Sequence, residues 1–167
     1  MKFIRYILLV LNIGLLLHGA CGCTRSSEKT TFSYTFLQER HCVQRVEICL
    51  YQDGYPLGTI TPLVQLAEPE VDLFWADIEN LECRKTKKLD TPSGYGDIIF
   101  LVTYQNGEKE IFSLVWIGYI SADGKHTETL QYFDPKKLSE VFAKYADPKV
   151  LVEKSEVFRH YWNSSEE

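Results

Sequence analysis

The sequence has few of the residues from which metal and catalytic sites are built, and it lacks their common spacings. Its 167 residues include four histidines, five cysteines and one methionine. There is no CxxC or HxxxH spacing that would suit zinc, and no GxSxG, HExxH, Walker or dinucleotide-binding glycine pattern. The sequence therefore predicts no catalytic residue, no metal site and no cofactor.

Positive charge is also scarce. Lys and Arg together number 18 against 23 Asp and Glu, which gives a formal net charge of −5. An acidic protein gains little from releasing the counterions of a polyphosphate, so no nucleic-acid partner is expected. Hydrophobic residues make up 45% of the chain, which is enough to fill the core of one globular domain.

Long hydrophobic runs are missing as well. The most apolar segment, residues 7–17, has 11 residues, whereas a helix that spans a bilayer needs roughly 20. Lys2 and Arg5 precede this segment, and small residues follow it. A basic start, a short apolar stretch and a small-residue end are the three parts of an export signal. Residues 1–22 are therefore predicted to be a signal peptide that is removed.

The end of this leader carries the most specific pattern in the chain. Residues 19–23 read Gly-Ala-Cys-Gly-Cys and resemble the lipobox of bacterial lipoproteins, in which small residues precede a cysteine. The resemblance implies that the Cys23 thiol is acylated and that signal peptidase II cuts before it. Acyl chains such as palmitate would then anchor the protein to a membrane. Cys21 is the alternative, although His18 would then occupy a position where the pattern has an apolar or small residue. The expected location is extracytoplasmic, on a cell membrane or an outer membrane.

The rest of the chain divides into three parts. Residues 23–31 are mostly polar and predict a lipidated tether, residues 32–162 a single domain, and residues 163–167 a disordered tail. In the domain, alternating apolar residues predict strands over 32–37 and 43–51, the second with one solvated face.

A turn and a helix are predicted next. Asp53-Gly54 indicates a turn, and residues 55–60 a short third strand. Glu68-Pro69-Glu70 then opens a helix with an apolar stripe through Leu81. The basic run Arg84 to Lys88 is expected at the C-terminus of this helix, where cations complement the dipole. The alternative for this run is contact with anionic lipid head groups or wall polymers near the tether.

The clearest local signal is a β-hairpin. Residues 98–104 and 110–117 are apolar on both faces and flank Asn106-Gly107, which favours a type I′ turn and predicts that Leu101 pairs with Phe112. A second hairpin is predicted around Asp123-Gly124, pairing residues 117–122 with residues 126–133.

The C-terminal part is predicted to be helical. Asp134-Pro135 starts a second helix and Asp147-Pro148 stops it, while residues 150–152 fit either a strand or the start of a last helix. The order of elements predicts an α+β fold, an antiparallel β-meander sheet with two main helices packed on it. This layout is similar to that of small bacterial lipoproteins of unknown function, and the resemblance implies no activity.

The three cysteines of the domain have two interpretations. Cys42 and Cys49 would be roughly 23 Å apart on one extended strand, so they cannot bond to each other. A possible disulfide joins Cys83 with Cys42 or Cys49, and the sequence does not choose between them. The alternative is three reduced thiols that act as small hydrophobic residues.

The remaining candidates for chemistry have structural explanations. The acidic residues Glu68, Glu70 and Asp72 suit a first helical turn, and Asp53 and Asp123 each stand alone where a calcium loop needs several carboxylates. Surface or packing positions are expected for the three histidines of the domain, and a core position for one tryptophan. Three tyrosines could form an exposed patch. These residues are His41, His126, His160, Trp116, Tyr95, Tyr119 and Tyr132.

These observations favour an extracytoplasmic, lipid-anchored module that is not an enzyme and binds an unknown protein or envelope partner. Two alternatives stay open: an inhibitor or protective lipoprotein that acts against a secreted enzyme or toxin, and a small envelope hydrolase with a dispersed site. The sequence does not determine the oligomeric state.

Overall fold

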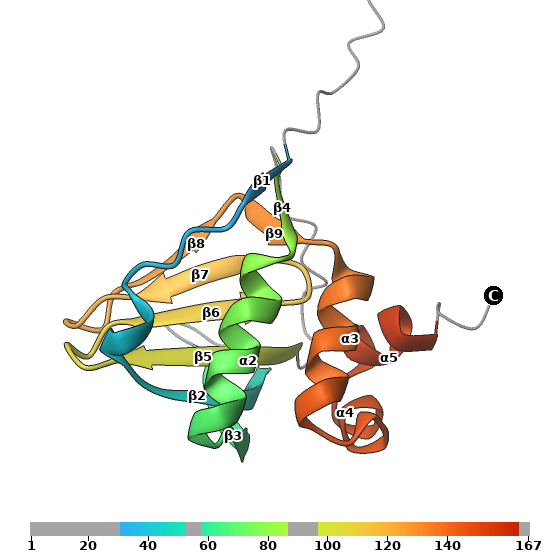
Figure 1. Ribbon diagram of the computed structural model, residues 1–167. Coiled ribbons are helices and arrows are strands. Elements are labelled where there is room, and N and C mark those ends of the chain that lie inside the picture. The colour runs from blue at the N-terminus through green and yellow to red at the C-terminus, as the bar shows by residue number, and fades with distance from the viewer. Residues whose placement is uncertain (1–30, 53–57, 87–96, 164–167) are drawn as a thin grey trace, which may run out of the picture.

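The computed structural model of the chain describes residues 31–52, 58–86 and 97–163, which form two antiparallel sheets and four α-helices (Figure 1). This is the predicted α+β class. The predicted signal peptide, both candidate acylated cysteines and most of the predicted tether lie outside the described residues, as do the turn predicted at Asp53-Gly54 and residues 164–167 of the predicted tail.

The larger sheet has six strands in the order β3-β2-β5-β6-β7-β8. These strands are β2 (Val43–Gln52), β3 (Thr59–Gln65), β5 (Asp97–Tyr104), β6 (Lys109–Ser113), β7 (Ile117–Ile120) and β8 (His126–Thr129). Every strand is antiparallel to its neighbours, which confirms the meander. β3 differs from the prediction, because it begins at Thr59 and extends well past Ile60.

A second, three-stranded sheet was not predicted. It has the order β1-β4-β9, from β1 (Thr31–Ser33), β4 (Glu82–Lys85) and β9 (Gln131–Phe133). The remaining elements are the 3₁₀ turn η1 (Arg40–Cys42) and the helices α2 (Glu68–Glu79), α3 (Pro135–Tyr145), α4 (Pro148–Lys154) and α5 (Glu156–Asn163). The small sheet lies at one end of the molecule, where the described part of the chain begins (Figure 1).

Helix α2 begins where the sequence predicts and ends two residues earlier. The Glu70 carboxylate accepts a hydrogen bond from the backbone amide of Ala67 at 2.7 Å, which satisfies an amide that the first turn leaves unpaired. The expected position of the basic run is wrong for Arg84 and Lys85, whereas Lys87 and Lys88 lie outside the described residues. Arg84 and Lys85 belong to strand β4, so they do not complement the C-terminus of α2.

The first hairpin is confirmed, but its register is one residue away from the prediction. Gly107 has φ 88°, whereas no described residue other than glycine has a positive φ, so Asn106 cannot take the type I′ conformation. The hairpin closes instead with a three-residue loop, in which the Tyr104 amide donates to the Glu108 carbonyl at 2.9 Å. As a result Phe100, not Leu101, lies opposite Phe112.

The second hairpin uses the same kind of loop. Gly124 has φ 84°, and the amide of Ser121 donates to the carbonyl of Lys125 at 3.0 Å. The predicted long return strand is divided, because β8 ends at Thr129 and β9 pairs with β4 in the other sheet. The break at Leu130 therefore joins the two sheets.

Helix α3 and its neighbours confirm the capping signals. The Asp134 carboxylate accepts hydrogen bonds from the amides of Lys136 and Lys137 at 3.1 and 3.3 Å. Asp147 caps α4 in the same way, so the segment that had two interpretations is a helix. All four helices contribute to one large core cluster on one face of the six-stranded sheet.

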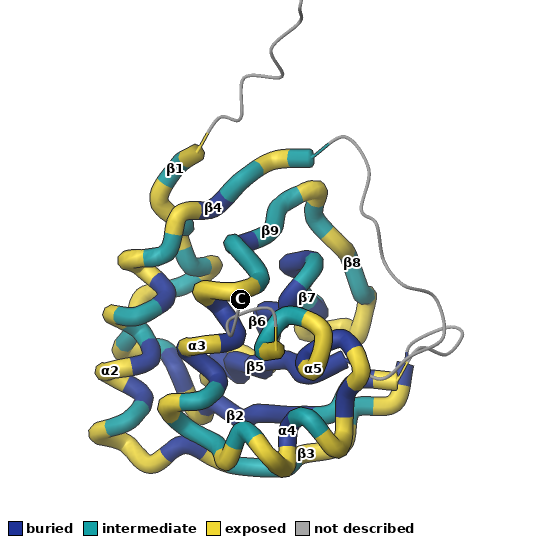
Figure 2. Tube along the Cα trace, turned by 90° about the vertical axis from the view of Figure 1, so that its right-hand side faces the viewer, coloured by how far each residue is buried: buried dark blue, intermediate teal, exposed yellow. Residues whose placement is uncertain are grey.

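The other face of the sheet is apolar too, and Figure 2 shows buried residues along β2, β5 and β6. Its buried cluster consists of Cys49, Tyr51, Ile99, Leu101, Ile111, Trp116 and Ile120. The prediction that β2 has a solvated face holds at Arg45, which is exposed, and is wrong further along the strand: the Cys49 side chain is fully buried and Glu47 is 7% exposed. The core position expected for Trp116 is confirmed at 3% exposure.

Replacement of Gly118 by alanine tests the packing of this second face. A Cβ atom at Gly118 would lie 2.7 Å from Cζ3 of Trp116 and 3.0 Å from the backbone oxygen of Thr127. Because the indole must move, we expect Gly118→Ala to lower the free energy of unfolding by about 1–3 kcal/mol. Urea unfolding measures this. The cost should shrink on a Trp116→Phe background, and an unchanged cost would show that the indole is not the cause.

Candidate functional site

The candidate site is built around residues 31–40, here called the N-terminal segment, which leads from β1 to η1 along the side of the molecule (Figure 1). Only its first three residues pair in a sheet, but the predicted alternation continues beyond them. Phe32, Tyr34 and Phe36 are half-buried against the large core cluster, and the residues between them are exposed. The segment therefore has one side on the core and one side in solvent.

A buried carboxylate holds this segment in place. Glu110 of β6 is 2% exposed, and its Oε1 accepts hydrogen bonds from the Tyr34 hydroxyl and the Leu37 amide, both at 2.8 Å. Its Oε2 accepts a hydrogen bond from the Tyr104 hydroxyl. Three donors thus converge on one carboxylate, which joins the N-terminal segment to the first hairpin.

Burial raises the pKa values of the ionisable groups in this cluster. Burial raises the pKa of Glu110, and the hydrogen bonds from Tyr104, Tyr34 and the Leu37 amide offset part of that rise. Burial and the nearby Glu110 carboxylate raise the pKa values of both tyrosines. The two hydroxyls therefore keep their protons at physiological pH and serve as donors.

Aromatic stacking on the same side fixes the segment against α2. The rings of Phe36 and Trp75 are stacked, with centroids 3.4 Å apart and an interplanar angle of 12°. The indole Nε1 of Trp75 donates to Oε1 of Glu79 at 3.0 Å, which orients that carboxylate. Tyr34 packs edge-on against Phe36 with centroids 5.6 Å apart, so the stack and the carboxylate cluster are continuous.

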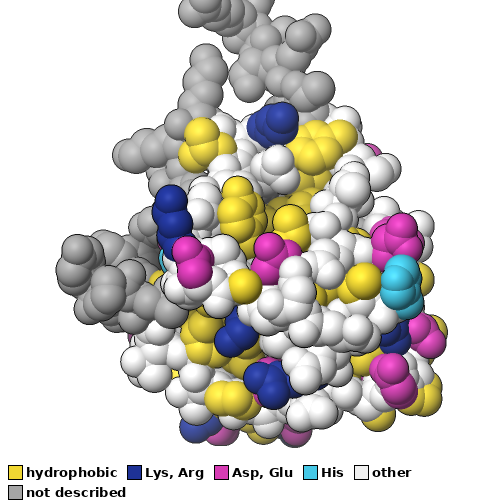
Figure 3. Space-filling view, turned by 90° about the vertical axis from the view of Figure 1, so that its left-hand side faces the viewer, with side chains coloured by type: hydrophobic (Ala, Val, Ile, Leu, Met, Phe, Trp, Pro, Cys, Tyr) yellow, Lys and Arg dark blue, Asp and Glu magenta, His cyan; other side chains and the backbone are white. Residues whose placement is uncertain are grey.

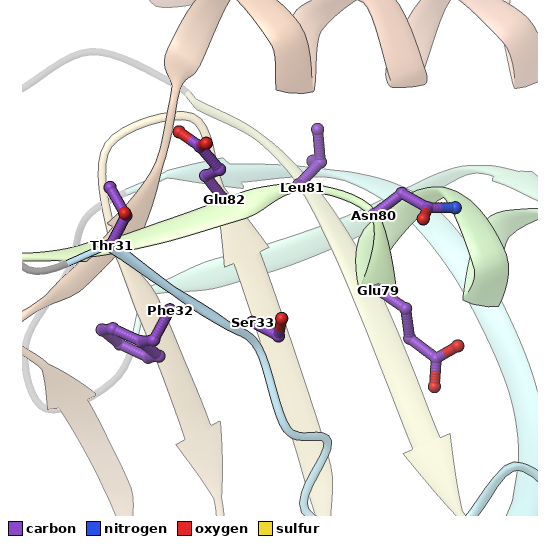
Figure 4. A pocket seen from close by; sticks show the side chains of 7 residues that line it. All are labelled: Thr31, Phe32, Ser33, Glu79, Asn80, Leu81 and Glu82. Atoms are coloured by element: carbon purple, nitrogen blue, oxygen red, sulfur yellow. The ribbon is translucent and has the colours of Figure 1, made fainter.

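Two cavities lie between the N-terminal segment and α2. The first, of about 480 Å³, is lined by residues 34–40 together with Trp75 and Glu79. The second, of about 250 Å³, is lined by residues 31–33 and 79–82. Figure 4 shows that the second cavity lies between β1 and the turn from α2 into β4, with Glu79 and Glu82 at opposite sides. Both cavities share Glu79, and together they are called the α2 groove.

One end of the α2 groove carries an ion-pair cluster. Nε of Arg40 lies 2.8 Å from Oδ1 of Asp72, and its Nη2 lies 3.3 Å from Oε2 of Glu68. This pairing explains two of the carboxylates that the sequence places in the first turn of α2. Figure 3 shows acidic and basic side chains interspersed with small hydrophobic groups on the adjoining face.

The histidines of the domain lie on three separate elements. His41 is exposed on η1, with its Nδ1 3.2 Å from Oε2 of Glu39, and His160 is exposed on α5. His126 differs from the solvated position that its turn suggests, because its half-buried ring packs edge-on against Trp116. Of the tyrosines considered as a patch, Tyr119 and Tyr132 are half-buried on different sheets, and Tyr95 lies outside the described residues.

The structure records Cys42, Cys49 and Cys83 as free thiols, so neither disulfide considered from the sequence, Cys83 with Cys42 or Cys49, is formed in it. Cys49 and Cys83 belong to separate core clusters. Burial raises the pKa of Cys49 to about 12 and that of Cys83 to about 11. Both therefore pack as protonated, small hydrophobic side chains.

The sequence analysis missed the contribution of Glu110. A signal was present, since Glu110 lies in a strand predicted to be apolar on both faces, where a carboxylate must find partners. Its partners Tyr34 and Leu37 lie 76 and 73 residues away along the chain, and no local pattern identifies them. Trp75 falls within the predicted helix, but its stack with Phe36 joins residues that are distant in the sequence.

Comparison of the chain with protein-family models, with curated proteins and with solved structures gives no significant match. Within the described ranges, no helix has the length and hydropathy to cross a membrane. The same residues contain no group of three or more His, Cys, Asp or Glu side chains arranged to hold a metal ion. The site is therefore interpreted from its own geometry.

Replacement of Tyr34 by phenylalanine tests the hydrogen bond to Glu110. The change removes one donor from a buried carboxylate, so we expect the free energy of unfolding to fall by about 1–2 kcal/mol. Tyr119→Phe is the matched control and should change it by less than about 0.5 kcal/mol. Urea unfolding compares the two variants, and equal effects would contradict the assigned role of the Tyr34 hydroxyl.

The pH dependence of stability tests the charge of Glu110. A raised pKa in the folded state means that the folded protein holds this proton more tightly than the unfolded chain. The stabilisation from that proton is complete below the ordinary pKa of glutamate and is lost as the pH rises through the raised pKa. The stability of the wild type relative to Glu110→Gln should therefore decline from mildly acidic to neutral pH.

Glu108→Gln is the control on the same hairpin, and its effect on stability should change with pH in the opposite direction. Hydrogen bonds from Asn106 and Gln38 lower the pKa of Glu108. Its contribution should be present at neutral pH and decrease as the pH falls through the lowered pKa. Urea unfolding across the pH range measures both variants. A wild-type advantage over Glu110→Gln that grows with pH would contradict a raised pKa for Glu110.

Proposed function

We propose that this protein is an extracytoplasmic binding module, anchored to a bacterial membrane through acylated Cys23, which binds its ligand in the α2 groove. The observation that carries the binding role is the groove itself. It combines a stacked aromatic pair with a rim of carboxylate, amide and guanidinium groups from Glu79, Gln38 and Arg40. Apolar surface with a few convergent polar groups is typical of ligand sites.

The position of the groove supports the link between anchor and binding. The N-terminal segment forms one wall, and only residues 24–30 separate Cys23 from β1. Seven residues and their flanking bonds can span at most roughly 28 Å at full extension. The anchor would therefore keep the β1 end of the domain close to the membrane surface, and the groove would start there.

Replacement of Cys23 by serine tests the anchor. We expect the wild type to incorporate an alkynyl palmitate label and to sediment with membranes, because a thioether-linked diacylglycerol holds it there. Cys23→Ser should lose both properties, and the matched variant Cys21→Ser should keep them. The proposal fails if Cys23→Ser still carries acyl mass. Labelling that depends on Cys21 instead would transfer the anchor to that residue.

Site-specific cross-linking tests the binding role. A photo-reactive benzoylphenylalanine at Leu37, which lines the groove and is 46% exposed, should capture a partner in intact cells. Benzoylphenylalanine at Val150 of α4, which is 43% exposed, is the matched control and should not capture the partner. Mass spectrometry identifies the adducts. Identical adducts from both positions, or none from Leu37, would contradict a ligand site in the groove.

A further inference from the structure

The backbone of the N-terminal segment is extended but incompletely paired. The ladder between β1 and β4 ends at Ser33 opposite Glu82, and the Leu37 amide bonds to Glu110. Between these points no hydrogen bond joins the backbone of Tyr34, Thr35 or Phe36 to another described residue. An extended stretch with unpaired amide and carbonyl groups is an edge to which another chain can add as a strand.

This unpaired stretch lines the larger cavity of the α2 groove. Thr35 and Phe36 both belong to its lining, and the stacked Phe36 and Trp75 rings form its apolar part. The side chains of Tyr34 and Phe36 pack against the core, so the segment is held in place, and residues 34–36 line a space that is already open. A polypeptide in extended conformation suits such a groove better than a compact ligand does.

The charges around the groove indicate the sign of the charge that a ligand should carry. Glu39, Glu79 and Glu82 line its two cavities, and the Glu39 and Glu82 side chains are 82% and 57% exposed. Among the described residues of the lining Arg40 is the one cation, and Asp72 and Glu68 already pair with it. Beside the second cavity, Nη2 of Arg84 lies 3.9 Å from Oε2 of Glu82 and Lys85 lies over the Phe32 ring, so the excess of negative charge is greatest at Glu39 and Glu79. The groove is therefore complementary to positive charge.

We infer that the α2 groove binds an extended cationic polypeptide segment by strand addition. The segment hydrogen-bonds to the backbone groups of residues 34–36 that lie on the edge facing the groove, and it places lysine or arginine side chains against Glu39, Glu79 and Glu82. This inference rests on the proposed binding function and deepens it by naming the ligand class. Alternate residues of the bound strand would face the aromatic pair, so a basic and apolar alternation is the expected pattern.

The probe is a fluorescent nonapeptide of alternating lysine and valine, titrated into the full-length chain in a non-ionic detergent. We expect saturable binding by fluorescence anisotropy, at least about tenfold tighter than that of the glutamate–valine counterpart, and weaker binding at high salt. Glu39→Gln combined with Glu79→Gln should lower the affinity about tenfold. Glu140→Gln combined with Glu153→Gln, two exposed carboxylates outside the groove, is the matched control for the loss of two charges.

Backbone methylation separates strand addition from simple charge attraction. Alternate residues of a strand present their amides to the same edge, so N-methylation of the valines and of the lysines blocks opposite edges. One methylated peptide should bind and the other should not. Equal binding of both would overturn strand addition, and equal binding of the glutamate peptide would overturn the choice of charge.

The outcomes also separate this inference from the proposed function. If Leu37 cross-links to a partner and Cys23 carries the acyl label while the lysine–valine peptide does not bind, the inference fails and the proposed function stands. If the peptide binds but Cys23→Ser changes neither labelling nor sedimentation, the anchor is wrong and the groove chemistry stands.

Discussion

Burial of the Glu110 carboxylate is the constraint that organises this side of the molecule. An ionisable group in the core is costly unless hydrogen bonds satisfy it, and Tyr34, Leu37 and Tyr104 supply three of them. Two of the three donors come from the segment that enters the domain. That segment must therefore cross the hairpin in one register, and its position next to α2 creates the groove.

Much of the fold could be predicted from local patterns. The apolar stripe of α2, the Asp134-Pro135 start of α3 and the glycine-containing hairpin loops each depend on residues close together in the sequence. Such signals identify an element before its partners are known. The α+β class followed from the order of these elements, and the structure confirms it.

The failures arose where the outcome depended on distant contacts or on one backbone angle. The register of the first hairpin differed because Asn106 keeps a negative φ, which adds a residue to the loop. The second sheet was missed because β1, β4 and β9 are three short strands from distant parts of the chain. For the same reason the groove was not foreseen, whereas acylation of Cys23 remains a prediction from a resemblance.

The pairing of β1 determines how the domain would bear mechanical tension. A force that pulls the chain at Thr31 acts first on the three residue pairs that join β1 to β4, and these pairs can separate one after another. The load then reaches Tyr34 and Leu37, where a single carboxylate holds two donors at once. Separation of the N-terminal segment from the domain should therefore stop at Glu110. The pairing of β1 with β4 can then be lost while the core stays folded.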